Sequence, residues 1–111
     1  MYPAFKNIQE LTFEESNHLG VFKKVIYSNL DLFSATTQVA YTELKAGIEV
    51  EEHSHDSMEE VFLVLHGSCE FYLNGNVHIL QKESVIKVSP KIKHKIKAIT
   101  DLKLFYFGVA I

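Results

Sequence analysis

Two histidines and two glutamates lie close together in an acidic stretch of the sequence. His53 and His55 are separated by one residue, and Glu59 and Glu60 follow shortly after. Side chains two positions apart in an extended segment point to the same side, so both imidazoles can reach one ion at about 2.0–2.1 Å. A neighbouring carboxylate adds an anionic oxygen. The pattern predicts part of a site for a divalent transition-metal ion.

A third histidine, His94, lies far along the chain in a segment with a clear alternation. In residues 91–98 every odd position is lysine, and every even position is isoleucine, histidine or alanine. Alternate side chains of a strand face opposite sides, so we expect His94 to point inward and the lysines to face water. Two histidines and one carboxylate form the triad that suits Fe(II), and a third histidine still leaves positions open for substrate on an octahedral ion.

Short apolar segments that must position these residues follow one another from residue 21 onward. They are rich in β-branched and aromatic residues and are separated by turn signals, as in all-β sandwiches and barrels. Asn74-Gly75 between two apolar runs indicates a tight hairpin. Residues 7–16 keep no clean helical period, so we predict an irregular segment or a short edge strand there. The expected strands are residues 21–27, 36–44, 61–65, 68–73, 77–81, 84–88, 92–99 and 102–109.

Length and composition are those of one small folded domain. The chain has 111 residues, of which 47% are hydrophobic and 23% charged, whereas disordered chains are poorer in apolar residues and richer in charge. The longest apolar run, residues 61–65, is far shorter than the roughly 20 residues of a membrane span, and no signal segment is visible, so we expect a cytoplasmic protein without a membrane partner. Cys69 is the single cysteine, and we interpret it as a small buried residue.

The charged residues argue against nucleic acid as a partner. The formal net charge is −3, and all basic side chains are lysines, because the sequence contains no arginine. The planar fork that binds phosphate at two points is therefore missing. We expect a small-molecule ligand or substrate instead.

The segment around the paired histidines resembles the first motif of the cupin superfamily. That motif runs G, five residues, H-x-H, three or four residues, E, six residues, G, and the chain matches it at every spacing. Glu60 is preferred over Glu59 as the carboxylate because only Glu60 is followed by six residues and then Gly67. The matching residues are Gly47, His53, His55, Glu60 and Gly67.

The second cupin motif, G, five residues, P-x-G, two residues, H, is only partly present. Glu83 stands for the first glycine, Ser89 for the proline and Lys91 for the second glycine, whereas His94 falls on the motif's histidine. The turn glycines are lost and the ligand position remains. The resemblance implies that His53, His55, Glu60 and His94 hold one divalent ion per chain, with Fe, Mn, Ni and Zn all open.

The resemblance also implies a fold and a range of functions. We expect a double-stranded β-helix of the jelly-roll type in residues 21–111, with residues 1–20 as an N-terminal arm or edge strand of a single cupin domain. A homodimer is expected. An isomerase or lyase acting on a small polar, sugar-derived or keto-acid substrate is favoured. An Fe(II)-dependent dioxygenase and a non-enzymatic small-ligand sensor are the alternatives, because one fold supports many chemistries.

Other polar residues receive no site role from the sequence. His66 shares strand parity with Glu60, yet a histidine before a turn glycine is more often a hydrogen-bonded structural residue. His18 and His78 are expected at the surface or in strands. For three tyrosines in expected strands, core or surface positions are favoured over a pocket: Tyr41, Tyr72 and Tyr106.

Overall fold

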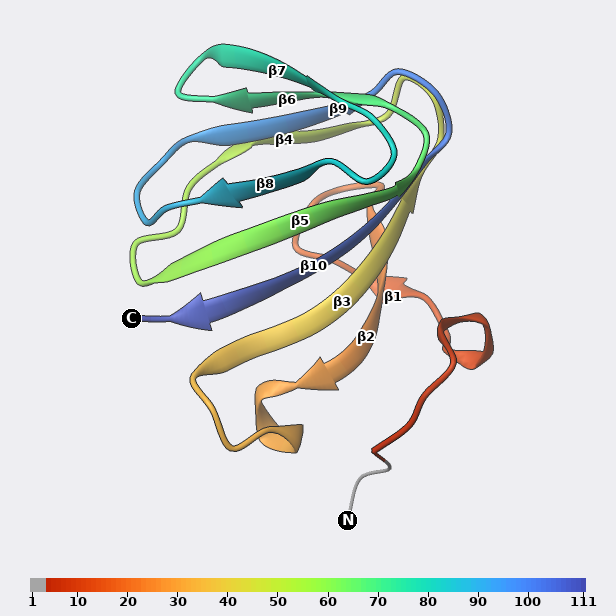
Figure 1. The fold of residues 1–111 in the computed structure, drawn as a ribbon, viewed down its shortest axis with the longest axis vertical. Coiled ribbons are helices and arrows are strands. Elements are labelled where there is room, and N and C mark those ends of the chain that lie inside the picture. Colours follow the sequence, from red (N-terminus) through yellow and green to blue (C-terminus); the bar gives the residue numbers. More distant parts are fainter. Residues whose placement is uncertain (1–3) are drawn as a thin grey trace.

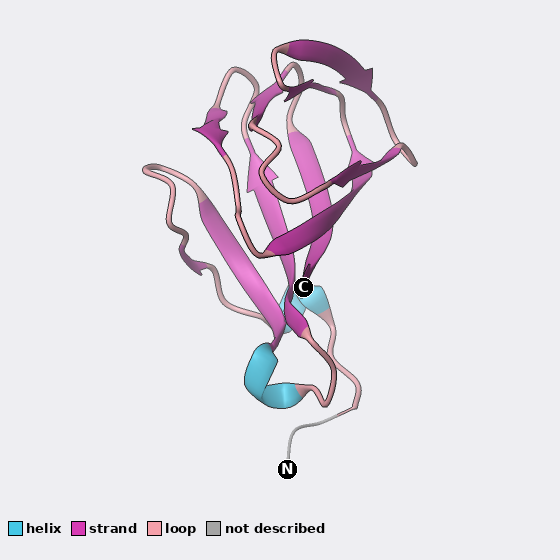
Figure 2. Cartoon of the chain, turned by 90° about the vertical axis from the view of Figure 1, so that its left-hand side faces the viewer, coloured by secondary structure: helices cyan, strands magenta, loops and turns pink. Residues whose placement is uncertain are grey.

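The computed structural model describes residues 4–111, which form two antiparallel sheets that face each other (Figure 1). The six-stranded sheet has the order β1-β2-β3-β10-β5-β8, and the four-stranded sheet has the order β4-β9-β6-β7. The strands are β1 (Glu14–Glu15), β2 (Phe22–Ser28), β3 (Thr36–Leu44), β4 (Glu49–His53), β5 (Met58–His66), β6 (Cys69–Leu73), β7 (Asn76–Leu80), β8 (Val85–Val88), β9 (His94–Ala98) and β10 (Leu102–Ala110). Two 3₁₀ turns, η1 (Ile8–Glu10) and η2 (Asn29–Asp31), lie near the N-terminal end of the molecule (Figure 2).

The hydrophobic core lies between the two sheets. Phe62 on β5 and Phe71 on β6 meet across it with their ring centroids 5.3 Å apart. Val64 and Leu104 add buried aliphatic side chains from the six-stranded sheet, and Ile96 adds one from the four-stranded sheet. Inward-facing residues of both sheets therefore fill one interior, which confirms the predicted all-β jelly roll.

The alternation in residues 91–98 is confirmed. His94, Ile96 and Ala98 are buried, and Lys93 and Lys97 are exposed. The lysines on this outer side also match acidic neighbours, since Lys95 Nζ lies 3.2 Å from Glu49 Oε1 on the adjacent strand β4. One face of β9 thus presents His94 to the interior.

Strand β4 is absent from the set of strands expected from the sequence. Three of its five residues are glutamates, a residue type that is depleted in strands, and only Val50 is buried. The strand forms because β9 provides a lysine-rich partner in register, with Glu49 opposite Lys97 and Val50 opposite Ile96. Opposite charges across two strands stabilise a pairing that local propensity disfavours.

The turns follow the expected chemistry at one site and depart from it at two others. Asn74 and Gly75 both have positive φ, at 47° and 83°, so the predicted hairpin between β6 and β7 is confirmed. Glu83 and Lys91 also have positive φ, at 72° and 68°. These two residues occupy the positions where the second cupin motif has glycine, so the turn geometry is kept without the residue that favours it.

The N-terminal segment runs along β2 on the side of the six-stranded sheet that faces away from the core. Lys24 Nζ donates to the carbonyl oxygen of Ile8 at 2.9 Å and lies over the ring of Phe13 at 4.7 Å from its centroid. The short strand β1 pairs with the start of β2, in agreement with the expected irregular segment or edge strand. Within residues 4–111 no helix is long and apolar enough to cross a membrane.

Candidate metal centre

The four residues chosen from the cupin motifs converge in the structure. His53, His55, Glu60 and His94 each offer one ligand atom, and these atoms all lie within 4.8 Å of one another. We call these four residues the His/Glu cluster. It is the arrangement required of a site for a single transition-metal ion, because His nitrogen and carboxylate oxygen ligands each sit about 2.0–2.2 Å from such an ion.

Both sheets contribute to the cluster. β4 ends at His53 and β9 begins at His94, and the two residues lie opposite each other in the register of that pair, with ring centroids 4.1 Å apart. Glu60 comes from β5 in the facing sheet, and its Oε1 lies 3.2 Å from His55 Nε2. The cluster therefore forms only when the two sheets close on each other (Figure 1).

Backbone carbonyl groups orient two of the imidazoles. His53 Nδ1 lies 2.8 Å from the carbonyl oxygen of Glu51, and His94 Nδ1 lies 3.0 Å from that of Ile92. A carbonyl oxygen can only accept, so each Nδ1 carries the proton and donates it. The Nε2 atoms are then unprotonated and available as metal ligands, which is the usual way in which ligand histidines are held.

Two buried polar atoms of the cluster are left without hydrogen bonds. Glu60 and His94 are 6% and 0% exposed, and Glu60 Oε1 and His94 Nε2 have no hydrogen-bond partner among residues 4–111. Such unpaired buried atoms are costly and rare in folded proteins. A cation held between them would satisfy both atoms, so the donor set fits a metal ion.

The surroundings of His53 favour its neutral imidazole. Burial lowers the pKa of His53, the hydrogen bond to the Glu51 carbonyl partly opposes this, and His94, His18 and His55 lower the pKa further. A neutral imidazole is the form that can bind a metal.

The choice between the two adjacent glutamates agrees with their positions. Glu60 points into the interior, in register with Gly108 on β10 and Val88 on β8. Glu59 lies opposite Val109 on the other face of the strand and is only partly buried. Neighbouring strand residues face opposite sides, so the two carboxylates cannot both reach the cluster.

The sequence predicts His18 at the surface or in a strand, but the structure places it in a turn, where it is half-buried and lines the cavity beside His53. Its ring centroid lies 4.3 Å from that of His53, and its Nδ1 lies 2.9 Å from Glu51 Oε1. A turn before β2 carries it there, since Val21 N donates to the His18 carbonyl at 3.1 Å. No local pattern around His18 signals this contact with β4.

A cavity of about 120 Å³ opens beside the His/Glu cluster, and we call it the barrel cavity. Apolar side chains from both sheets, including Val50, Phe62 and Ile96, form part of its wall. A water molecule occupies about 30 Å³ in the liquid, so the barrel cavity has room for about four waters or one small ligand. Its remaining polar lining consists of Ser16, Asn17, His18, Lys23, Gln38, Thr42 and Tyr106.

The three tyrosines left open by the sequence have different places. Tyr106 lines the barrel cavity, where burial and then the carboxylates of Glu60 and Glu14 raise its pKa. Tyr41 is buried, and its hydroxyl donates to Glu43 Oε2 at 2.7 Å. Tyr72 donates to Glu70 at 3.1 Å and lies against Lys95. Only Tyr106 lies beside the His/Glu cluster.

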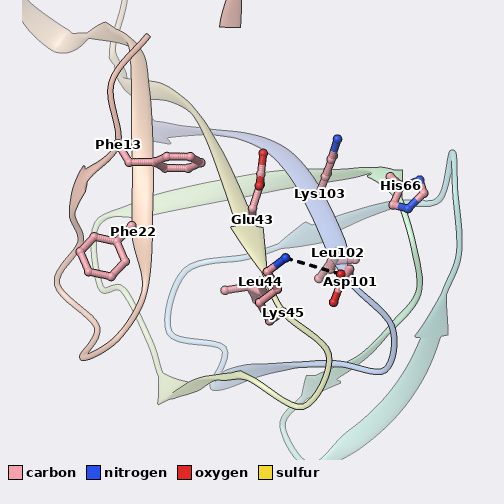
Figure 3. Close-up of a pocket in the computed structure, with 9 residues that line it drawn as sticks. All are labelled: Phe13, Phe22, Glu43, Leu44, Lys45, His66, Asp101, Leu102 and Lys103. Carbon is pink, nitrogen blue, oxygen red and sulfur yellow. Dashed lines mark ion pairs between the residues drawn. The ribbon is translucent and has the colours of Figure 1, made fainter. Parts of the chain in front are cut away.

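His66 is exposed and lies outside the barrel cavity. The register between β5 and β10 shifts so that Leu104 faces Val64 while Lys103 faces His66. The extra residue, Leu65, breaks the alternation and moves His66 off the inner face. His66 instead borders a separate groove of about 500 Å³. Two residues that line this groove, Lys45 and Asp101, form an ion pair at 3.7 Å (Figure 3).

Two further expectations about single residues are confirmed. Cys69 is fully buried, and burial raises the pKa of its thiol to about 11. His78 is exposed on β7. Neither residue belongs to the candidate metal centre.

Comparison with known protein families identifies the family of this chain. A model of the Cupin domain matches residues 40–109, a span that includes the whole His/Glu cluster. The chain belongs to the cupin domain family. A search of curated protein sequences finds no significant match.

Solved structures with this cupin fold have diverse descriptions. A predicted oxalate decarboxylase from Thermotoga maritima is 23% identical, with a TM-score of 0.87 over 95% of this chain and 97% of that one. KdgF from Halomonas sp. is 15% identical, with a TM-score of 0.76 over 93% and 92%. A salicylate 1,2-dioxygenase from Pseudaminobacter salicylatoxidans is 24% identical, with a TM-score of 0.64 over 68% of this chain and 21% of that one. These likenesses show the cupin fold.

Proposed function

We propose that this cupin is a metal-dependent enzyme of the isomerase or lyase type that acts on a small polar, sugar-derived or keto-acid substrate. His53, His55, Glu60 and His94 would hold one divalent transition-metal ion. The observation that carries the proposal is the pair of buried, unpartnered atoms Glu60 Oε1 and His94 Nε2 beside a cavity of about 120 Å³. A bound ion supplies Lewis acidity toward a substrate oxygen.

The protein's own residues support chemistry in this cavity. Backbone carbonyls orient His53 and His94, so little reorganisation is needed when a ligand binds. Phe62, Ile96 and Leu104 line the cavity with apolar surface that excludes water from part of it. Tyr106 has a raised pKa, so it holds its proton at neutral pH and can donate a hydrogen bond, or a proton, to a substrate oxygen.

The test combines metal analysis with turnover. Protein purified without chelator, and protein reconstituted in turn with Fe, Mn, Ni, Co and Zn, should contain close to one ion per chain. Panels of uronates, keto acids and deoxysugars are then assayed for isomerisation or elimination. Turnover that disappears with chelator supports the proposal, and a metal content far below one ion in every preparation overturns it.

The same experiment separates the two alternatives. Iron after anaerobic purification together with oxygen uptake identifies an oxygenase. Tight ligand binding without any turnover identifies a sensor or carrier. The solved structures with the same fold carry descriptions that include a decarboxylase and a dioxygenase, so measurement of the reaction is needed to choose among cupin chemistries.

We propose in addition that residues 1–111 form one domain that pairs with a second copy. The outer face of the six-stranded sheet supports this, because Phe105 lies in register with Leu63, and Phe107 lies in register with Val61 and Val39. These side chains are only half-buried within one chain. Light scattering should give the mass of a dimer, and Phe105→Asp should give a folded monomer. A wild-type monomer at high concentration contradicts the pairing.

A further inference from the structure

One charged side chain on the wall of the barrel cavity has no role in the His/Glu cluster. Lys23 on β2 is the one lysine among the described residues that line the cavity. The chain has no arginine, so Lys23 is the permanent cation that the cavity offers to a ligand. The neighbouring histidines are neutral when they bind a metal.

Strand alternation sends Lys23 inward. Lys23 lies opposite Thr42, and Thr42 lies opposite the fully buried Leu104. Opposite residues of antiparallel strands share a face, so these three side chains all begin on the inner face of the six-stranded sheet. The adjacent Lys24 points the other way and is held by Ile8 and Phe13.

Lys23 lies opposite Glu14 in the register of β1 and β2, but the two side chains form no ion pair. Lys23 Nζ donates to Oε1 of Gln38 at 3.0 Å, and a neutral amide carries no balancing charge. Among residues 4–111, Lys23 forms no ion pair, although Lys45 and Lys95 both do. A half-buried ammonium next to a neutral amide is an incomplete site for an anion, because charge-assisted hydrogen bonds to a carboxylate are about twice as strong as neutral ones.

The strand register places this pair near the metal centre, on the same sheet as Glu60. Gln38 on β3 lies opposite Gly108 on β10, and Gly108 lies opposite Glu60 on β5. Adjacent strands are about 4.8 Å apart, so the backbones of Gln38 and Glu60 are about 10 Å apart. Gly108 puts no side chain between them. A Cβ there would lie 2.6 Å from Thr37 Oγ1 and 3.1 Å from Met58 Sδ.

We propose that Lys23 and Gln38 form the subsite for the carboxylate of a small organic acid whose other end lies at the His/Glu cluster. The inference rests on the proposed function, which it narrows to acidic substrates such as keto acids, hydroxy acids and uronates. Lys23 supplies the positive charge. Gln38 fixes the position of Nζ and adds an amide donor beside it. A cavity of about 120 Å³ admits a small organic acid and is too small for a nucleotide-linked sugar.

The test measures acid binding by calorimetry on metal-loaded protein, with three acids and the neutral counterparts of two of them. The acids are 2-oxoglutarate, malate and galacturonate, and the neutral molecules for the last two are malamide and galactose. At least one acid should bind more tightly than its neutral counterpart. Lys23→Met should weaken that acid about ten- to a hundredfold, the loss expected for a charged hydrogen bond, and leave the neutral molecule unchanged. Lys23→Arg should restore part of the affinity.

Matched controls separate this inference from the proposed function. Lys103→Met removes a lysine from the outer groove of the same sheet and should not change acid binding. The metal content of Lys23→Met should equal that of the wild type. If Lys23→Met fails to fold, Lys23→Gln is used in its place. If the wild type takes up no metal, the proposed function fails, and the same variants are compared in metal-free protein. Equal affinity of wild type and Lys23→Met for every acid, no acid binding at all, or tighter Lys23-dependent binding of inorganic phosphate overturns the inference.

Discussion

His94 Nε2 on β9 and Glu60 Oε1 on β5 lie 3.4 Å apart across the interior, and neither atom has a hydrogen-bond partner in the described part of the chain. The two residues come from facing sheets, so the fold itself brings them together. Without a cation between them, the protein keeps two buried acceptors in contact, because the Nδ1 proton of His94 is already donated to a carbonyl. The arrangement destabilises the metal-free protein and favours metal uptake.

The first prediction concerns which glutamate binds the metal. Glu60→Ala should lower metal affinity by at least the 10- to 100-fold that the loss of even a supporting group typically costs. Glu59→Ala should leave metal content unchanged, because Glu59 lies on the other face of β5. Elemental analysis of the two variants side by side gives the answer. If the Glu59 variant lacks metal and the Glu60 variant retains it, the assignment of Glu60 as the ligand is wrong.

The second prediction concerns stability. A metal present at about 100 times its dissociation constant should stabilise the native state by about 2.7 kcal/mol, since the complete cluster exists only in the folded protein. For a chain of this size the melting temperature should rise by about 10 °C. Differential scanning calorimetry with and without chelator measures the shift. In His94→Ala the shift should be much smaller, and an equal shift there would place the metal elsewhere.

Much of this centre was predictable because its signals are local. The lysine alternation around His94 defines the inner face of β9, and the spacing from Glu60 to Gly67 selects the correct carboxylate. His18 and Lys23 were not predictable as cavity residues, because each reaches the site through a long-range contact. His18 lies in a turn that packs against β4, and Lys23 lies on β2, which pairs with β3. The strand β4 was also missed, since its glutamates disfavour strands until β9 pairs with them.

The third prediction concerns Lys91, one of the two residues that stand where the second cupin motif has glycine. Lys91 has a φ of 68°, a conformation that costs an ordinary L-residue roughly 1–2 kcal/mol. Lys91→Gly should therefore raise the free energy of unfolding by about 1 kcal/mol, after allowance for the greater freedom of glycine in the unfolded chain. The hydrogen bond from the Lys91 backbone N–H to the His55 carbonyl, at 2.7 Å, is retained. Urea unfolding measures the change.

A matched control for this substitution is Asn74→Gly. Asn74 also has positive φ, at 47°, but asparagine tolerates that region well. Its replacement should change the free energy of unfolding by only a few tenths of a kcal/mol. A loss of stability in Lys91→Gly would show that the lysine side chain contributes more than its backbone strain costs.

The fourth prediction concerns the buried thiol. Burial raises the pKa of Cys69 from 9.0 to about 11, so the thiolate is about a hundredfold scarcer at pH 8 in the native protein than in the unfolded chain. A thiol reagent should react correspondingly slowly until denaturant is added. Because the unfolded thiol loses its proton first, this group's contribution to stability falls as pH rises from about 9 to 11. Fast native-state reaction that titrates near pH 9 would contradict the burial of Cys69.

The last prediction concerns Tyr106, which lines the barrel cavity beside Glu60. If its hydroxyl donates to a substrate oxygen, Tyr106→Phe should lower turnover by about 100-fold or more, the usual contribution of a positioned proton donor. Metal content should stay the same, because phenylalanine keeps the stacked contact with Phe62, whose ring centroid lies 5.2 Å away. Tyr72→Phe on the other sheet is the matched control and should leave turnover unchanged. Burial and two carboxylates raise the pKa of Tyr106, so its hydroxyl keeps its proton through pH 10. The pH profiles of the wild type and the Phe variant should therefore have the same shape near pH 10. Equal turnover in wild type and Tyr106→Phe would show that the Tyr106 hydroxyl takes no part in the reaction and that the side chain serves only in packing.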